Sequence, residues 1–195
     1  MVRSYSTRAV PGDVLDSVLD IAVRGPSAGF CQGVDLLVLE GREQVGLFFE
    51  KTSDPEFISG PRALPGLLNA PVIVLPICDP DMYVSRYAEP DKAHSSLAGL
   101  SAERWPTPYW LVDASFMVML LLLAATDNDL GALFFRLHKD PGPLLRALGV
   151  PENKQVIGAI SLGYDATAGS QEAPSGSPAR RGRRPTAELV HRGTW

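Results

Sequence analysis

The fold is decided by the stretch DASFMVMLLLLAAT, which occupies Asp113–Thr126 and carries no charge, glycine or proline after its first residue. Methionine, leucine and alanine are strong helix formers. Apolar side chains would cover every face of this helix instead of a single stripe, so a helix lying on the surface is disfavoured. The run is also shorter than the about 20 apolar residues that a membrane span requires. It therefore predicts a helix buried on all sides, either in the middle of the fold or at a contact with a second subunit.

Segments on both sides of this helix alternate between helical and strand patterns. An amphipathic pattern after Gly12 predicts a helix that ends at Gly25-Pro26, and weaker patterns predict helices over 42–51 and 141–148. Runs rich in valine, isoleucine and leucine predict buried strands, over 35–40, 71–78, 131–135 and 156–162. Because helices and strands are interspersed, the sequence predicts an α+β or α/β layered fold. We interpret residues 1–195 as a single domain.

Two segments lack a regular pattern. Residues 79–110 are rich in aromatic and charged side chains, which is typical either of a lid over a ligand site or of a surface excursion packed by its own aromatic rings. Residues 165–195 form a predicted C-terminal arm that begins with small residues and proline and contains the run Arg180-Arg181-Gly182-Arg183-Arg184. Taken alone, the arginine run suits a solvated tail or a nucleic-acid contact, although the net charge of −4 disfavours nucleic acid.

The composition argues against several kinds of site. The chain has two cysteines, Cys31 and Cys78, and three histidines, and their spacing fits neither a zinc site nor a CxxC redox motif. We therefore expect no metal. No basic segment followed by a short apolar run opens the chain, so we expect a cytoplasmic protein with free thiols.

A loop of mostly small residues, Pro26-Ser27-Ala28-Gly29-Phe30-Cys31-Gln32-Gly33, separates the first predicted helix from the first predicted strand. Little side chain stands in front of its backbone, so its N–H groups are expected to be open to a ligand. On composition alone, a plain connector is equally compatible with this loop.

Three segments, in order, resemble the nitroreductase family of flavin enzymes. The first runs from Arg3-Ser4-Tyr5 to the loop that ends at Gln32. The second is Trp110-x-x-Asp113 at the start of the apolar helix, followed by Leu130-Gly131. The third runs from Val150-Pro151 through Leu162-Gly163-Tyr164 to the arginine run and Trp195. Residues 41–109 match only loosely.

The resemblance implies an α+β fold, a three-layer sandwich in which helices flank a central antiparallel-type sheet, assembled as an intertwined homodimer. It implies FMN at the subunit interface, reduced by NAD(P)H, with the electrons passing to a small organic acceptor such as a nitroaromatic, a quinone, an enone or a biosynthetic intermediate. The flavin N5 would carry the reaction, so no catalytic side chain is expected.

The resemblance also assigns candidate binding residues. For the FMN phosphate and ring it implies an N-terminal group, a loop group, a strand group and an arginine pair: Arg3, Ser4 and Tyr5; Pro26, Ser27, Ala28 and Gln32; Leu130 and Gly131; Arg181 and Arg183. Substrate candidates lie in the irregular segment and at the start of the apolar helix: Arg86, Tyr87, Tyr109 and Trp110.

The sequence departs from the family at several positions. The first of two N-terminal arginines is missing, and Arg8 is a possible substitute. Phe30 and Gly33 stand where many members have asparagine and proline, Asp129 replaces a glycine, and Arg136 replaces a small residue. These departures leave two alternatives open. One is a flavin-consuming enzyme like dimethylbenzimidazole synthase, and the other is a non-catalytic flavin-binding or structural protein.

Overall fold

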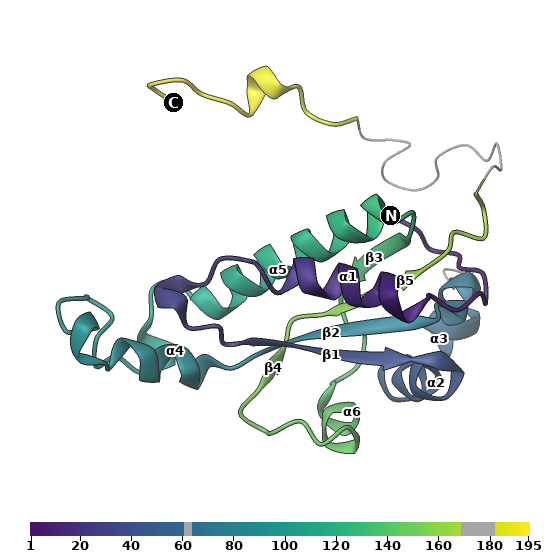
Figure 1. Ribbon diagram of the computed structural model, residues 1–195, viewed down its shortest axis with the longest axis horizontal. Helices are drawn as coiled ribbons and strands as arrows, with labels where there is room; N and C mark the ends of the chain where they lie inside the picture. The colour runs from purple at the N-terminus through teal and green to yellow at the C-terminus, as the bar shows by residue number, and fades with distance from the viewer. Residues whose placement is uncertain (61–63, 169–181) are drawn as a thin grey trace.

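The computed structural model describes residues 1–60, 64–168 and 182–195 (Figure 1). Its centre is an antiparallel sheet in the order β1-β2-β5-β3, with the short strand β4 paired to β2. The strands are β1 (Val34–Glu40), β2 (Val72–Cys78), β3 (Gly131–Phe135), β4 (Gln155–Val156) and β5 (Ala159–Gly163). The α+β class is confirmed, and all four apolar runs that were expected to be strands lie in this sheet.

The run 156–162 is not one strand, as the sequence predicted, but two short ones separated at Gly158. Both pair with β2: β5 lies opposite Val72–Val74, and β4 lies opposite Ile77 and Cys78. Between these two stretches stands Pro76, which has no backbone N–H to donate to a neighbouring strand. The change from β5 to β4 therefore falls where β2 cannot donate a ladder hydrogen bond, although Pro76 O still accepts one from Ile157 N at 3.4 Å.

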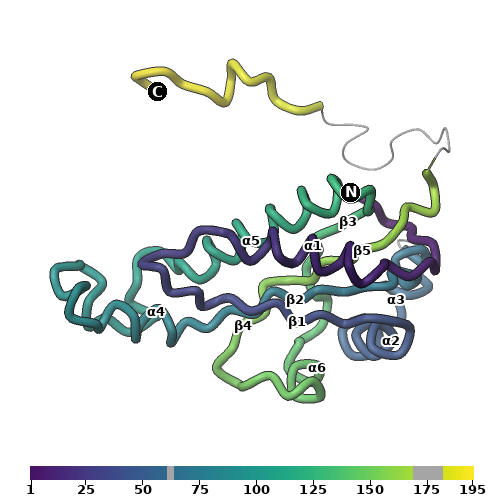
Figure 2. Tube along the Cα trace, in the orientation of Figure 1, coloured from purple at the N-terminus to yellow at the C-terminus, as the bar shows by residue number. Residues whose placement is uncertain are grey.

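Helices cover both faces of the sheet, which gives three layers (Figures 1 and 2). One face packs against α1 (Gly12–Ala22) and α5 (Tyr109–Asp127), whose apolar side chains share a core with Val72, Val74 and Ile160. The other face packs against α2 (Gly41–Thr52), the 3-10 turn η2 (Pro65–Asn69) and α6 (Gly142–Ala147). Alternating side chains along β2 serve both cores, which explains why all seven of its residues are buried.

The long helix α5 begins earlier than its apolar run and leaves one face open within the chain, so the predicted burial at a contact with a second subunit stays a prediction. It begins at Tyr109, four residues before Asp113, and spans 19 residues. It is also not buried on all sides within one chain, because one apolar face remains open: Leu111 is 38%, Phe116 46%, Met119 52% and Leu123 54% exposed. Length and composition alone would suit a membrane span, but the opposite face of α5 packs on α1 and the sheet.

The segment 79–110 is more regular than its sequence suggested. It contains α4 (Pro80–Tyr87) and two 3-10 turns, η3 (Pro90–Lys92) and η4 (Ala102–Arg104). Asp79 caps α4 by accepting a hydrogen bond from Asp81 N at 3.1 Å, and Pro80 occupies the first helical position. Two further short elements, α3 (Pro55–Ser59) and η2, lie between α2 and β2.

Candidate functional site

The loop between α1 and β1 is held in one conformation by hydrogen bonds from its own backbone. Phe30 N donates to Ser27 O, Cys31 N to Ala28 O and Gln32 N to the Ser27 hydroxyl, at 2.9, 3.2 and 3.1 Å. Its central turn is the 3-10 segment η1 (Ala28–Phe30). The expectation of open N–H groups is therefore wrong for these residues. The loop offers side chains to a ligand instead, above all those of Phe30 and Gln32, which are exposed.

A buried carboxylate anchors this loop to α5. Asp113 Oδ2 accepts hydrogen bonds from Ala28 N at 2.9 Å and from the Tyr83 hydroxyl at 2.7 Å, and Asp113 is only 6% exposed. Burial, together with the hydrogen bond to Asp113 and its charge, raises the pKa of Tyr83, so the phenol stays protonated and donates. The sequence placed Asp113 in a motif but gave it no role. An isolated acidic residue at the start of an otherwise apolar helix was the sequence feature that could have indicated such a role.

Tyr83 in turn explains why residue 33 is a glycine. A Cβ at Gly33 would lie 2.5 Å from Tyr83 Cε2 and 3.0 Å from Cδ2, closer than any side chain tolerates. Tyr83 cannot move aside easily, because its hydroxyl is bound to Asp113 and its ring meets Trp110 edge-on at 6.1 Å. Loop, α4 and the start of α5 are therefore packed as one unit.

Arg86, a predicted substrate residue, is engaged with protein groups. Its Nε donates to Gly29 O at 2.9 Å, and its two terminal nitrogens bind both Asp91 oxygens at 2.7 and 2.8 Å. Glu89 lies 3.0 Å from the same guanidinium. The hydrogen bond from Arg86 lowers the pKa of Asp91 to about 2, so the pair stays ionised at neutral pH. Arg86 thus supports the loop from α4.

Replacing Arg86 with lysine is expected to loosen the loop without unfolding the protein. An ammonium group cannot donate to both Asp91 oxygens and to Gly29 O in the planar arrangement that arginine provides. We expect several-fold faster hydrogen exchange at residues 28–32, measured by mass spectrometry. Arg104→Lys, at an exposed arginine of η4, is the matched control. Unchanged exchange in Arg86→Lys would mean that the guanidinium does not hold the loop.

The other predicted substrate residues belong to a cluster of aromatic rings. Trp105 meets Tyr87 at 5.0 Å, Trp110 at 6.1 Å and Tyr109 at 6.2 Å between ring centroids. Trp110 is 7% exposed and donates from Nε1 to Gln155 Oε1 at 3.2 Å. Tyr87 lies against the loop, because a Cβ on Gly29 would be 2.9 Å from its ring. The segment is packed by its own aromatic rings, as the second interpretation predicted, and it also buttresses the loop. Its role as a lid over a ligand site stays a prediction.

The predicted N-terminal and strand residues gather at the other end of α5. Val2 N donates to Ala132 O at 3.1 Å, and a Cβ on Gly131 would be 2.6 Å from Val2 Cγ2. Arg3, the next residue, is exposed, whereas Leu130 is buried in the core. Ser4 is half-buried beside Gly66. Arg3 and Gly131 are therefore neighbours, as a shared site requires.

Tyr5 has a structural position. It is 1% exposed, and its hydroxyl bonds with Ser161 Oγ at 2.9 Å and with Val2 O at 3.1 Å. Burial raises its pKa to about 12. Tyr5 fastens the N-terminal segment to β5, and its hydroxyl is engaged by protein groups.

Only one arginine of the predicted pair lies in the described part of the chain. Arg181 lies outside the described residues, and Arg183 is exposed, as is every residue from 182 to 195. The short turn η5 (Thr186–Glu188) precedes a stack of His191 on Trp195 with ring centroids 4.3 Å apart. Arg8, the possible substitute for the missing arginine, sits over the Tyr164 ring at 4.0 Å. The role of these cations in holding a phosphate stays a prediction.

Both thiols are buried, and their burial makes the folded state less stable at alkaline pH. Burial raises the pKa of Cys78 to about 12 and that of Cys31 to about 11. The folded state therefore favours the protonated thiols, and their contribution to stability is complete below pH 9 and lost as the pH rises towards 12. We expect the free energy of unfolding to fall by about 1–3 kcal/mol between pH 8 and pH 10.

Urea titrations at the two pH values measure this loss. The same titrations are made on the double variant Cys31→Ser/Cys78→Ala. Its free energy of unfolding should change less between the two pH values than that of the wild type, whatever its absolute stability. An equal loss in both proteins would assign the effect to other groups. At pH 8 neither thiol of the native protein should react with a disulfide reagent.

A cavity of about 600 Å³ lies away from the predicted site. It is lined by the N-terminal segment, the β1–α2 junction and η2, with Thr7, Arg42 and Asn69 among its polar side chains. It contains none of the predicted cofactor or substrate residues. Within the described residues no group of three or more His, Cys, Asp and Glu side chains is placed to hold a metal ion.

The architecture defines the class of protein. The chain superposes on a nitroreductase family protein from Clostridium difficile 630 with a TM-score of 0.66 at 22% identity, covering 100% of this chain and 93% of the other. A protein from Desulfovibrio desulfuricans, solved in complex with FMN, gives 0.67 at 21% identity, with 100% and 91% covered. NfrA2 of B. megaterium gives 0.71 at 17% identity, with 100% and 70% covered. These likenesses establish the nitroreductase fold.

Sequence comparison then gives the family. A sequence model of the Nitroreductase family matches residues 1–164, and the chain belongs to this family of flavin-dependent oxidoreductases. A protein of Archaeoglobus fulgidus named "Putative NADH dehydrogenase/NAD(P)H nitroreductase" is 26% identical over 166 residues, which are 84% of this chain and 79% of that protein. A protein of the same name from Methanothermobacter thermautotrophicus is 27% identical over 168 residues, 85% and 72% of the two chains.

Proposed function

We propose that this protein is an FMN-dependent oxidoreductase that passes electrons from NAD(P)H through bound FMN to a small organic acceptor, and that it acts as a homodimer. The observation that carries the proposal is the position of the predicted cofactor residues. The loop 26–32 lies at the start of α5, where Ala28 binds Asp113, whereas Arg3 and Gly131 lie beyond its end. The helix between them is 19 residues long, or about 28 Å.

A second copy of the chain would bring the two groups of predicted cofactor residues together. Two α5 helices packed antiparallel about a two-fold axis would place the loop of one subunit beside Arg3 and Gly131 of the other. The open face of α5 suits such a contact, because it presents Phe116, Met119 and Leu123 to solvent along one side. An apolar stripe of this kind is typical of a protein interface.

The residues present fit the chemistry of FMN. Arg3 and Arg183 are exposed cations for its phosphate. Ser27 and Gln32 offer a hydroxyl and an amide from the loop 26–32, whose backbone is already fixed by hydrogen bonds. Bound FMN would supply hydride transfer, and the protein groups would bind and orient it. The names of the two curated relatives support NAD(P)H as the electron donor.

The test is the visible absorbance spectrum of the purified protein, with its mass from size-exclusion chromatography with light scattering. We expect a yellow dimer with about one FMN per chain, bleached by NADH or NADPH and reoxidised by a nitroaromatic or quinone acceptor. A protein that stays colourless after incubation with FMN would refute the proposal. Flavin that binds but is not reduced by either nicotinamide would favour a non-catalytic flavin-binding protein.

A further inference from the structure

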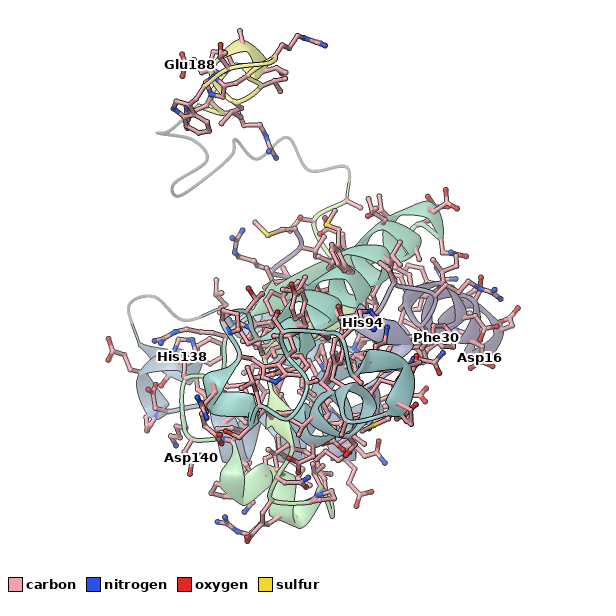
Figure 3. All side chains as sticks on the ribbon, turned by 90° about the vertical axis from the view of Figure 1, so that its left-hand side faces the viewer. Asp16, Phe30, His94, His138, Asp140 and Glu188 are labelled. Carbon is pink, nitrogen blue, oxygen red and sulfur yellow. The ribbon has the colours of Figure 1, made fainter. Side chains whose placement is uncertain are left out.

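Phe30 is an unusual residue for its position. Its side chain is 77% exposed at the tip of the loop, and its backbone has φ = +57°. Figure 3 shows Phe30 at the outer surface of the molecule. The left-handed region is unfavourable for a bulky residue, and glycine would relieve the strain. An exposed aromatic ring held at an unfavourable φ gains no core packing in return, so folding alone does not account for a phenylalanine at this position.

The loop under Phe30 is rigid. Its neighbour Cys31 is 7% exposed, Phe30 N itself donates to Ser27 O, and Gly29 O accepts from Arg86 Nε. Gln32, two residues further on, also has a left-handed backbone with φ = +52° and is exposed. A planar apolar face and an amide are therefore presented together from a fixed backbone.

We propose that Phe30 is a specificity-determining residue of the oxidoreductase, whose ring forms one wall of the acceptor site and stacks on planar aromatic acceptors. The inference rests on the proposed function, in which the loop of one subunit faces the flavin site of the other. Its chemical content is a preference for aromatic and quinonoid acceptors over saturated ones.

The open face of α5 does not account for Phe30. That face is formed by side chains of the helix itself, whereas Phe30 projects from the loop tip, where packing between two helices does not require a ring. Aromatic stacking with correct geometry changes affinity by about three- to tenfold. The preference should therefore be visible as a difference between two ligands of similar size that differ in planarity.

Nitrobenzene and nitrocyclohexane are such a pair. The oxidised, FMN-loaded dimer is titrated with each compound, and binding is followed through the flavin absorbance without any turnover. We expect the wild-type protein to bind nitrobenzene about three- to tenfold more tightly, Phe30→Ala to lose this preference and Phe30→Trp to keep it. Ile58→Ala, at a 40% exposed position on α3, is the control and should behave like the wild type.

Stability provides a second readout. Phe30→Gly removes the ring and relieves the left-handed backbone, so it should melt no lower than the wild type while losing the preference for nitrobenzene. An unchanged preference in Phe30→Ala, with FMN bound and reducible by NAD(P)H, would overturn the role of Phe30 and leave the proposed function intact. Loss of dimer or FMN in Phe30→Ala would also overturn it, since the ring would then be an interface residue. A wild-type protein that takes up no FMN would overturn both proposals.

Discussion

Asp113→Ala is expected to lower the free energy of unfolding by about 3 kcal/mol, because one buried and one part-buried donor lose their common acceptor at about 1–3 kcal/mol each. The donors are Ala28 N and the Tyr83 hydroxyl, and both bind the same oxygen of Asp113. For a chain of this size the melting temperature should fall by roughly 6–12 °C. Flavin content should fall as well, since the loop 26–32 loses its anchor.

Two variants separate the hydrogen bonds from other effects of the substitution. Asp113→Asn keeps one oxygen that can accept both bonds and should cost no more than about 1 kcal/mol. Tyr83→Phe removes only one donor and should fall between Asn and Ala. Urea titrations at one fixed protein concentration compare all four proteins. If Asp113→Ala unfolded at the same urea concentration as the wild type, the carboxylate would not be what fixes the loop.

Leu123→Arg is expected to convert the proposed dimer into monomers and to reduce FMN affinity at least about 100-fold. Leu123 is 54% exposed on α5, so arginine has no clash to make within one chain. In the proposed dimer the same change places two charges in an apolar contact, and burying unpaired charges is strongly unfavourable. The cofactor should be lost together with the dimer, because its predicted contacts come from two subunits.

The measurement is sedimentation or light scattering at several protein concentrations, with flavin fluorescence for affinity. Ile21→Arg, at a 37% exposed position on α1, is the matched control and should remain a dimer that holds FMN. A monomeric Leu123→Arg protein that still binds FMN tightly would contradict a site shared between subunits. A dimeric one would place the interface elsewhere.

Local sequence patterns predicted much of this fold. The four buried strands followed from runs of branched apolar residues, and the central helix followed from one uninterrupted apolar stretch. What they could not predict depends on partners distant in sequence. The break between β4 and β5 depends on Pro76 of the neighbouring strand. Helix α4 shows no apolar stripe in its sequence, because Tyr83 and Tyr87 pack against the rings of Trp110 and Trp105. From sequence alone, the open face of α5 cannot be distinguished from core, because a hydrophobic core and a subunit interface are built from the same apolar residue types.

The site was less accessible from sequence. The resemblance named the loop, Arg3 and Gly131, and the structure places these residues where two copies could combine them. It could not reveal that Arg86 is occupied by Asp91 and Gly29 O, because an arginine in an irregular segment looks the same whether it binds substrate or protein. Asp113 was visible as an isolated acid, but its function depends on Tyr83, 30 residues away in the chain.

The contact between Gly33 and Tyr83 has a consequence for protein engineering. A design that followed the family pattern described above would place proline at position 33, on the reasoning that common residues stabilise. In this chain any side chain there meets the Tyr83 ring, whose position Asp113 fixes. The two positions therefore form one steric unit that must be exchanged together. Proline at 33 becomes admissible only alongside a smaller residue at 83, and that exchange would also remove the hydroxyl from the anchor of the loop.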